Sequence, residues 1–180
     1  KPLSFNRLSN ILKSAGAVLG KQTVINYVGY MMDSYMLFTL QNYAAKLVEK
    51  ETSPKYYFMD TGLLGLMLMD CSSAQLENLV AIELIRRYGR ENVFYFEKNV
   101  EIDFYVPEEK LAIQVSLQVL DQIDTREREI GAFVKLKNFI GDATCLLITN
   151  SEEEELDYEG VHVSVVPVWK WLLQNRKQDI

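Results

Sequence analysis

The sequence has few of the residues on which many enzyme mechanisms depend. It contains one histidine, His162, and two cysteines, Cys71 and Cys145, which stand far apart. A zinc site of clustered cysteine and histidine is therefore excluded. A serine–histidine triad is disfavoured, because His162 lies in the alternating segment 161–166, VHVSVV, which is typical of a strand. Two isolated thiols fit a reducing environment, so we expect a cytoplasmic protein.

Two longer patterns are also absent. No apolar run approaches the length of a membrane-spanning helix, so we expect no membrane partner. The P-loop pattern GxxxxGKS/T does not occur; the segment 16–23, GAVLGKQT, lacks its glycine spacing and a preceding strand. This excludes ATP hydrolysis by P-loop chemistry within the chain. The first residues, KPLSFNRLSN, do not include an initiator methionine, and we interpret the chain as part of a longer protein.

Charge is unevenly distributed along the 180 residues, whose net charge is −6. Residues 1–62 hold seven Lys/Arg and four Asp/Glu, whereas residues 63–180 hold twelve and twenty-one. The asymmetry predicts two parts, divided at residue 62, with different surfaces. Phosphate contacts need local positive charge, so any nucleic-acid binding falls to the first part.

The first part has the outline of a winged helix-turn-helix. Helical spacing over 4–15, glycines at 16 and 20, and renewed helical spacing from 21 predict two helices joined by a turn. The aromatic segments 34–43 and 53–60 predict a two-stranded ribbon. Candidate DNA-contacting residues flank or lie on the second helix. They are Lys13, Lys21, Gln22, Thr23 and Asn26. The alternative is docking, because an apolar helix at 22–38 with Tyr27, Tyr30 and two methionines carries more apolar surface than one stripe requires.

The second part predicts an α/β domain with a mixed sheet and helices on both sides. DTGLL at 60–64 is interpreted as a turn and a seam, and SEEEELDYEG at 151–160 as an acidic surface loop. The remaining elements follow in the order α-β-β-β-α-β-β-α. They are expected at 74–89, 92–98, 100–107, 111–119, 124–141, 143–150 and 161–175, the last range holding a strand and a short closing helix. The third of these strands has almost no polar break, so we expect it to be central.

Strand residues around 100–116, VEIDFYVPEEKLAIQVS, contain the candidate site. Carboxylates that converge on Mg²⁺, with a nearby lysine, are typical of metal-dependent nucleases. Asp103 is a candidate first carboxylate, and Glu101 lies on the same face and competes with it. A structural role for Asp103, accepting backbone hydrogen bonds, is equally open. Glu83 lies about 240° around its helix from Glu77, so we expect it to be solvated or paired with a neighbouring arginine.

The order of these segments resembles the restriction-endonuclease-like, or PD-(D/E)XK, fold. The set SPKYYFMDTGLL, LENLVAIEL, VEIDFYV and LAIQVS, after a helix-turn-helix, is similar to a bacterial and archaeal family of AAA-type P-loop ATPases. Their C-terminal region, of unknown function, joins a winged helix to a PD-(D/E)XK-like sheet. The resemblance covers nearly the whole chain. It implies that an ATPase domain, with bound ATP, precedes residue 1 and is a partner of this chain.

The resemblance also assigns the nuclease-like positions. Glu77 matches the helix acid, Asp103 the strand acid and Gln114 the next ligand position. Ser116 stands where the family has its lysine, and Lys98 and Lys110, at strand ends, do not replace it. With Asp103 and Glu77 as the remaining carboxylates, we expect weak metal binding at most and no catalysis.

Three hypotheses follow. The first is a non-catalytic recognition and regulatory region of an AAA-type ATP-binding protein, which contacts DNA through its winged helix and requires no cofactor of its own. The second is a Mg²⁺-dependent nuclease that uses Glu77, Asp103 and Gln114. The third is a protein-interaction module, whose contact is the helix at 22–38 and whose partner is another protein or a second copy.

Overall fold

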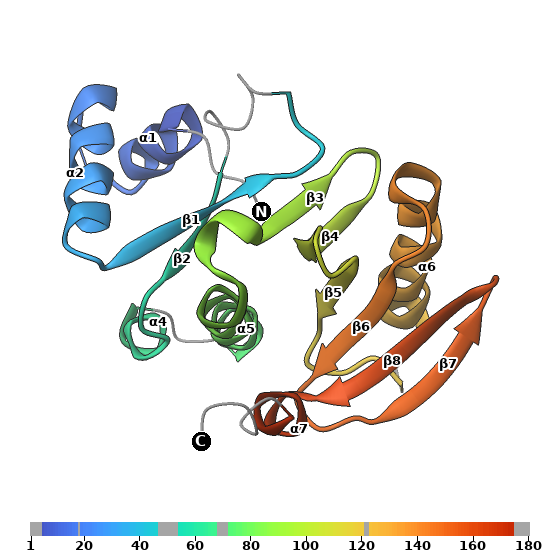
Figure 1. Ribbon diagram of the computed structural model, residues 1–180. Coiled ribbons are helices and arrows are strands. Elements are labelled where there is room, and N and C mark those ends of the chain that lie inside the picture. Colours follow the sequence, from blue (N-terminus) through green and yellow to red (C-terminus); the bar gives the residue numbers. More distant parts are fainter. Residues whose placement is uncertain (1–4, 18, 47–53, 68–71, 121–122, 175–180) are drawn as a thin grey trace.

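An eight-stranded sheet forms the centre of the protein (Figure 1). The computed structural model describes residues 5–17, 19–46, 54–67, 72–120 and 123–174. The strands are β1 (Leu37–Asn42), β2 (Lys55–Phe58), β3 (Phe94–Glu97), β4 (Glu101–Val106), β5 (Leu111–Val115), β6 (Thr144–Thr149), β7 (Glu154–Tyr158) and β8 (Val161–Pro167). The helices are α1 (Phe5–Ser14), α2 (Lys21–Asp33), α4 (Gly62–Met67), α5 (Ser72–Tyr88), α6 (Ile123–Ile140), α7 (Val168–Leu173) and the short 3-10 helix η1 (Arg90–Asn92).

The sheet is mixed, with the strand order β2-β1-β3-β4-β5-β6-β8-β7. β1 pairs in parallel with β3, and β6 pairs in parallel with β5 and β8; the other pairs are antiparallel. The crossover from β5 to β6 runs through α6, as a parallel pair requires. These observations confirm a mixed α/β architecture, and β5 lies inside the sheet as its apolar sequence predicts.

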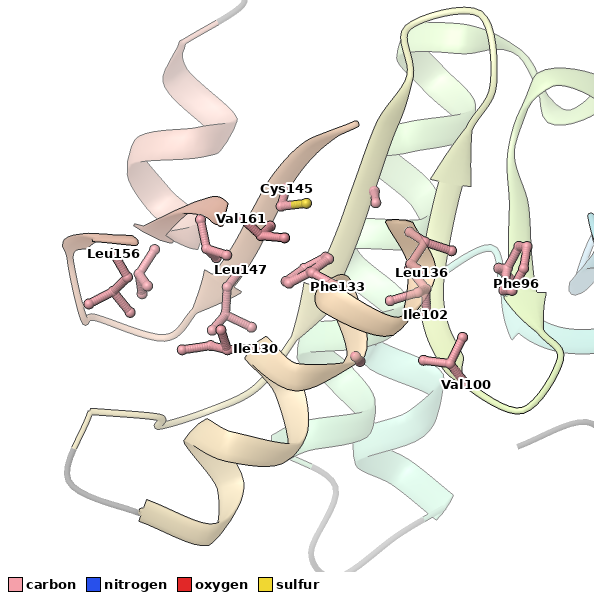
Figure 2. Packing of buried hydrophobic residues seen from close by; sticks show 14 of the residues in the cluster. Phe96, Val100, Ile102, Ile130, Phe133, Leu136, Cys145, Leu147, Leu156 and Val161 are labelled. Atoms are coloured by element: carbon pink, nitrogen blue, oxygen red, sulfur yellow. The ribbon is translucent and has the colours of Figure 1, made fainter. Parts of the chain in front are cut away.

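Helices cover the sheet on two sides, each with its own apolar core. The alternation of side chains along the strands sends Ala112 of β5 to one core and Ile113 to the other. The first core lies under α6, where Figure 2 shows Ile130, Phe133 and Leu136 among side chains from the strands. The second core joins the sheet to α5 and α7 and includes Val80, Leu84 and Trp171.

The N-terminal helices and strands are joined to the rest of the protein through this sheet. β1 and β2 pair antiparallel, and β1 then pairs with β3 at Gln41 and Asn42. The Asn42 side chain bonds to both the backbone N–H and the carbonyl of Glu97. On the helical side, the rings of Phe5 and Tyr56 lie 6.5 Å apart and connect α1 to β2. One hydrogen-bonded sheet therefore extends across residue 62, and the division into domains 1–62 and 63–180 stays a prediction.

Two expectations near this junction were wrong. α2 ends at Asp33, well short of residue 38, because Tyr35 takes a φ of 56° and the chain enters β1 at Leu37. The segment at 60–64 is also more than a turn, since α4 begins at Gly62. The Asp60 carboxylate accepts a hydrogen bond from the Gly62 N–H at 2.7 Å and orders this helix start.

The acidic segment 151–160 was expected to be a loop, but it contains β7. Glu154–Tyr158 pairs antiparallel with β8, with Asp157 opposite His162. The two residues of the connecting turn, Glu159 and Gly160, have φ values of 48° and 76°, which suit a tight hairpin. Leu156 is buried while its strand neighbours Glu155 and Asp157 are exposed, so these two carboxylates are solvated as expected although the backbone is paired. Glu152 departs from that expectation, because it accepts hydrogen bonds from the Val119 and Leu120 N–H groups.

The two cysteines have different outcomes. Cys145 lies buried on β6, as expected for a thiol that packs as a small apolar residue. Burial raises the pKa of this thiol to about 11. Cys71 lies outside the described residues. Across the part of the chain that the structure describes, no helix has the length and apolar character needed to span a bilayer.

Candidate functional site

A buried lysine lies among three carboxylates at the edge of the sheet formed by β2. The ammonium nitrogen Nζ of Lys55 is 3.0 Å from Oε1 of Glu101, 3.4 Å from Oδ1 of Asp103 and 3.9 Å from Oε1 of Glu77. It also lies 5.4 Å from the centre of the Tyr95 ring. The lysine side chain is 3% exposed. We call Lys55, Glu77, Glu101 and Asp103 the lysine–carboxylate cluster.

Three elements bring the cluster together. Glu101 and Asp103 are two residues apart on β4 and therefore lie on one face of the strand. Glu77 comes from α5, which packs on the sheet and extends its carboxylate toward β2. Lys55 opens β2, and the alternation of that strand also directs Tyr57 inward. Asp103 and Glu77, the two carboxylates selected from the sequence, are thus brought together, and Glu101 joins them.

Tyr57 holds the helix carboxylate in place. Its hydroxyl donates a hydrogen bond to Oε1 of Glu77 at 2.8 Å, and its side chain is buried. Burial raises the Tyr57 pKa well above its ordinary value, and the nearby Glu77 and Asp103 carboxylates raise it further. The hydroxyl therefore remains a donor over the physiological pH range.

Asp103 is held from two sides. Its Oδ2 accepts a hydrogen bond from the backbone N–H of Val115 at 3.0 Å, and its Oδ1 faces Lys55. Burial and the neighbouring Glu77 carboxylate raise the Asp103 pKa to about 7, against the opposing effect of the lysine. The structural role considered from sequence, acceptance of a backbone hydrogen bond, is confirmed. Near neutral pH this carboxyl is poised between its two protonation states.

Lys55 remains charged in this setting. Burial lowers the pKa of Lys55, but the carboxylates of Asp103, Glu77 and Glu101 together outweigh burial, and the pKa lies above its ordinary value. An ammonium group has hydrogen-bond donors and no acceptor, so it suits a position between carboxylate oxygens. The cluster therefore contains a permanent positive charge supplied by the chain.

Gln114 and Ser116 do not complete the cluster. The Gln114 side chain bonds to backbone groups of β4: its Oε1 accepts the Asp103 N–H at 2.8 Å, and its Nε2 donates to the Glu101 carbonyl at 3.2 Å. Ser116 lies beyond the end of β5 and donates a hydrogen bond to the Gln118 carbonyl. The expectation that residues 114 and 116 share one strand face was therefore wrong for Ser116, because the strand ends at Val115.

A pocket of about 560 Å³ opens beside the cluster. All four cluster residues line it, together with Gln114 and a rim from α5 and α6. The rim includes Ser73, Arg128, Glu129 and Lys135. Arg128 pairs with the buried Glu129 at 2.6 Å. The pocket is thus lined by groups of both charges, and one of them, Glu101, has a side chain that is 41% exposed.

The oxygens at this site do not fit a resident Mg²⁺ ion. A hard cation requires several oxygen ligands directed at one point. Here Glu77, Asp103 and Gln114 already accept hydrogen bonds from Tyr57 and the backbone, and an ammonium group stands between the carboxylates. Among the residues that the structure describes, no group of three or more His, Cys, Asp or Glu could hold a metal ion, and no buried polar side-chain atom lacks a hydrogen-bond partner.

Glu83 belongs to a second ionic group on α5. Its carboxylate accepts hydrogen bonds from Arg86 at 2.8 Å and from Arg87 at 2.7 Å. Arg87 also donates to the Trp171 carbonyl, and its guanidinium lies 4.2 Å from the centre of the Trp171 ring. Of the two alternatives expected for Glu83, pairing with a neighbouring arginine is confirmed, and solvation is wrong because the residue is buried. We call Glu83, Arg86, Arg87 and Trp171 the glutamate–arginine cluster.

The candidate DNA-contacting residues lie around the start of α2. Lys13, near the end of α1, and Lys21, at the start of α2, are both exposed. Gln22 and Asn26 are exposed and bonded to each other, with Nε2 to Oδ1 at 3.1 Å, while Thr23 is half-buried. The same helix exposes Tyr27 and Tyr30. Both interpretations of this surface, DNA contact and docking, therefore stay open.

Lys55 and Tyr57 were not predicted from the sequence. Both lie in the segment KYYF, where a lysine and a tyrosine two residues apart share one strand face. A lysine on the face that also buries a tyrosine indicates an ionic partner, because a buried lysine needs one. The partners lie 22 to 48 residues away in sequence, and nothing local specifies them.

Comparison with known proteins links the chain to a protein family and to an archaeal protein. Residues 1–74 match a protein family described as a domain of unknown function (DUF8612). The chain is also 32% identical over 181 residues to the uncharacterized protein MJ1544 of Methanocaldococcus jannaschii. That match covers 95% of the chain and 41% of the archaeal protein, so the chain spans less than half the length of this curated relative. No solved structure matches the chain.

Proposed function

We propose that this chain is a non-catalytic recognition and regulatory region of an AAA-type ATP-binding protein. In this proposal residues 1–62 form a winged helix-turn-helix that recognises a partner, and residues 63–180 form a nuclease-like domain that serves as a scaffold. The observation that carries the proposal is the position of the Lys55 ammonium group, which lies among the carboxylates of Glu77, Glu101 and Asp103.

The arrangement of elements supports the winged helix and the nuclease-like domain. Two helices precede an antiparallel strand pair in the first part, as in a winged helix. In the second part a helix precedes the antiparallel strands β3, β4 and β5, and α6 leads to a parallel strand. The pair Asp103 and Gln114 lies on adjacent strands beside Glu77, which is the layout implied by the PD-(D/E)XK resemblance.

An ATPase neighbour is proposed from the resemblance stated above. The archaeal relative has more than half of its length outside the matching region, which leaves room for such a domain. We expect ATP to leave the melting temperature of this chain unchanged and to raise that of a longer protein that includes the ATPase domain. A shift in both would indicate a nucleotide site within these 180 residues and would contradict the assignment.

A cleavage assay separates the proposal from the nuclease alternative. Purified chain, incubated with plasmid and single-stranded DNA in Mg²⁺ or Mn²⁺, is expected to give no cleavage. The alternative is a Mg²⁺-dependent nuclease that uses Glu77, Asp103 and Gln114, with Lys55 in place of the absent motif lysine. Cleavage that disappears in Asp103→Ala would establish that alternative.

DNA contact by the first part is tested by fluorescence anisotropy with duplex DNA over a range of salt. If Lys13 and Lys21 contact phosphates, the double variant Lys13→Ala/Lys21→Ala reduces the slope of log affinity against log salt by about 2. The matched control is Lys98→Ala/Lys110→Ala, which removes two exposed lysines from the second part. Equal losses in both variants would indicate non-specific attraction only.

The protein-interaction alternative rests on the exposed tyrosines of α2. Tyr27 and Tyr30 are 53% and 63% exposed, so α2 presents two large aromatic side chains to solvent. Exposed apolar surface of this kind is typical of protein-interaction sites when it is contiguous. Under this alternative the chain self-associates or binds a protein partner with little dependence on salt. Sedimentation at two ionic strengths, with Tyr27→Ser/Tyr30→Ser as the comparison, distinguishes it from DNA binding.

A further inference from the structure

The lysine–carboxylate cluster has an excess of negative charge around one buried cation. Three carboxylates lie within 3.0 to 3.9 Å of a single ammonium nitrogen. Carboxylates this close repel one another unless a cation lies between them or one of them is protonated. Within the cluster one ammonium group faces three carboxyl groups, so it can offset only part of this repulsion. A divalent ion at the same point would offset more of it.

From this we infer that Lys55 is a tethered substitute for a divalent cation, and that its charge is what keeps metal ions out of the cluster. The inference deepens the proposed function and rests on it, because it names what occupies the nuclease-like site. It predicts that removal of the lysine charge converts the same carboxylates into a site for Mn²⁺ or Ca²⁺. The site in the wild-type chain is then closed to metal by one side chain.

The carboxylate side chains can move far enough for a metal ion to take the place of the Lys55 ammonium group. Metal–oxygen distances of about 2.0 to 2.6 Å are shorter than the present contacts with Nζ, so the oxygens must move inward by roughly 1 Å. Glu77 and Glu101 have side chains that are 30% and 41% exposed, and such side chains can shift. Asp103 is fixed by the Val115 N–H and provides the anchor.

Lys55 can be substituted without changing the elements that carry the carboxylates, because it lies on a different strand. The lysine comes from β2, whereas the carboxylates come from α5 and β4. Truncation of Lys55 therefore empties the centre of the cluster and leaves the backbone under each carboxylate unchanged. The pocket of about 560 Å³ beside the cluster gives a hydrated ion a path to that centre.

The experiment compares the wild-type chain, Lys55→Ala and Lys55→Met by calorimetric titration with Mn²⁺ and Ca²⁺ and by thermal unfolding. Lys55→Met retains most of the side-chain volume and guards against an effect of the cavity alone. We expect both variants to melt below the wild type without metal. At a concentration about 100 times the dissociation constant, metal should raise their melting temperatures by about 5 °C or more, with little change in the wild type.

Two further variants identify the site of binding. In Lys55→Ala/Asp103→Ala the metal-dependent rise should disappear, since the anchoring carboxylate is absent. Lys135→Ala removes an exposed lysine from the rim of the same pocket and should behave as the wild type. Binding that survives in the double variant would place the ion elsewhere in the chain and would overturn the inference.

Other outcomes are equally decisive. Variants that fold without metal and gain no metal binding would show that Lys55 does not substitute for an ion, as would variants that fold at no metal concentration. Equal metal affinity in the wild type and Lys55→Ala would show that the lysine excludes nothing. The proposed function fails separately, through DNA cleavage by the wild-type chain, whatever the variants bind.

Discussion

Helix α5 contributes to two ionic clusters of opposite composition. Their comparison distinguishes a candidate functional site from a group of ion pairs that stabilises the fold. In the lysine–carboxylate cluster one cation faces three carboxylates, beside an open pocket. In the glutamate–arginine cluster one carboxylate, Glu83, faces two arginines, one of which lies against a tryptophan ring. The first therefore keeps an excess of negative charge, whereas the second spreads its positive charge over an aromatic ring and a backbone carbonyl.

The carboxyl pKa values record this difference. Asp103 has a raised pKa because of burial and Glu77, while Glu83 has a lowered pKa because of its hydrogen bonds to Arg86 and Arg87, which overcome burial. A carboxyl group in a pocket whose pKa is shifted so that its usual charged form is disfavoured is typical of functional sites. The glutamate–arginine cluster, in contrast, stabilises the charged form of its acid and joins α5 to α7. The difference is the one that the proposed origin of the lysine–carboxylate cluster in a nuclease-like site predicts.

The largest expected effect comes from removing the central lysine. Lys55→Ala leaves three partly buried carboxylates without their cation, and we expect the free energy of unfolding to fall by about 3–5 kcal/mol at pH 7. Urea denaturation with a chelator present measures it. Lys135→Ala should change the same quantity by less than about 0.5 kcal/mol, because this lysine is exposed. Equal effects of the two changes would remove the distinction between a cluster lysine and a rim lysine.

A smaller loss is expected at the glutamate–arginine cluster. Arg87→Ala removes the bond to Glu83, the bond to the Trp171 carbonyl and the contact with its ring, but Arg86 still pairs with Glu83. We expect a loss of about 2 kcal/mol in the free energy of unfolding, measured by urea denaturation. Arg86→Ala, whose side chain is 55% exposed, should cost less. A larger loss for Arg86→Ala would show that the ring contact contributes little.

The two clusters should respond to pH in opposite directions. A carboxyl whose folded pKa is raised binds its proton more tightly in the folded state, so its contribution to stability is lost as pH rises. For Asp103 this window runs from about 4 to about 7. The stability of the wild type relative to Asp103→Asn should therefore fall by more than about 1 kcal/mol across that range. Urea denaturation at several pH values measures the difference.

Glu83 provides the reverse case. Its folded pKa is lowered, so its contribution is present above its ordinary pKa and is lost as pH falls below about 4.5. The stability of the wild type relative to Glu83→Gln should be constant from pH 5 to 8 and fall in acid. The same sign of pH dependence for Asp103→Asn and Glu83→Gln would contradict the assigned difference between the clusters.

The smallest expected effect concerns the tyrosine that positions Glu77. Tyr57→Phe removes one hydrogen bond of 2.8 Å to a carboxylate that solvent also reaches, so we expect a loss of about 1 kcal/mol in the free energy of unfolding. Tyr30→Phe, on the exposed face of α2, is the control and should leave stability unchanged. Equal stability of the Tyr57 variant and the wild type would show that the Tyr57 hydroxyl contributes nothing to the cluster.

Much of the fold could be predicted because its signals are local. The nearly unbroken apolar run along 111–115, the alternation along 161–167 and the helical spacing along 123–140 each lie within one element. The parallel pairing of β5 and β6 follows from the crossover between them. The edge strand β7 could not be predicted in the same way. Its acidic composition is that of a loop, and only pairing with β8 makes it a strand.

The site was half predictable for the same reason. Asp103 and Glu101 lie on one strand face, and their proximity follows from a period of two. Lys55 reaches them only because β1 pairs with β3 and carries β2 to the edge of the sheet, a long-range arrangement that local sequence does not specify. The motif places its lysine at position 116, where this chain has Ser116. The lysine that reaches the carboxylates is Lys55, which lies 61 residues earlier in the chain.

The most direct measurement is a crystal structure of the wild-type chain grown with excess Mn²⁺, with anomalous scattering recorded for manganese. We predict that Lys55 Nζ lies between Glu101 and Asp103, as here, and that no anomalous peak lies within about 3 Å of either carboxylate. An anomalous peak coordinated by Asp103 and Glu77, with Lys55 displaced, would contradict the central claim and would identify the site as a metal centre.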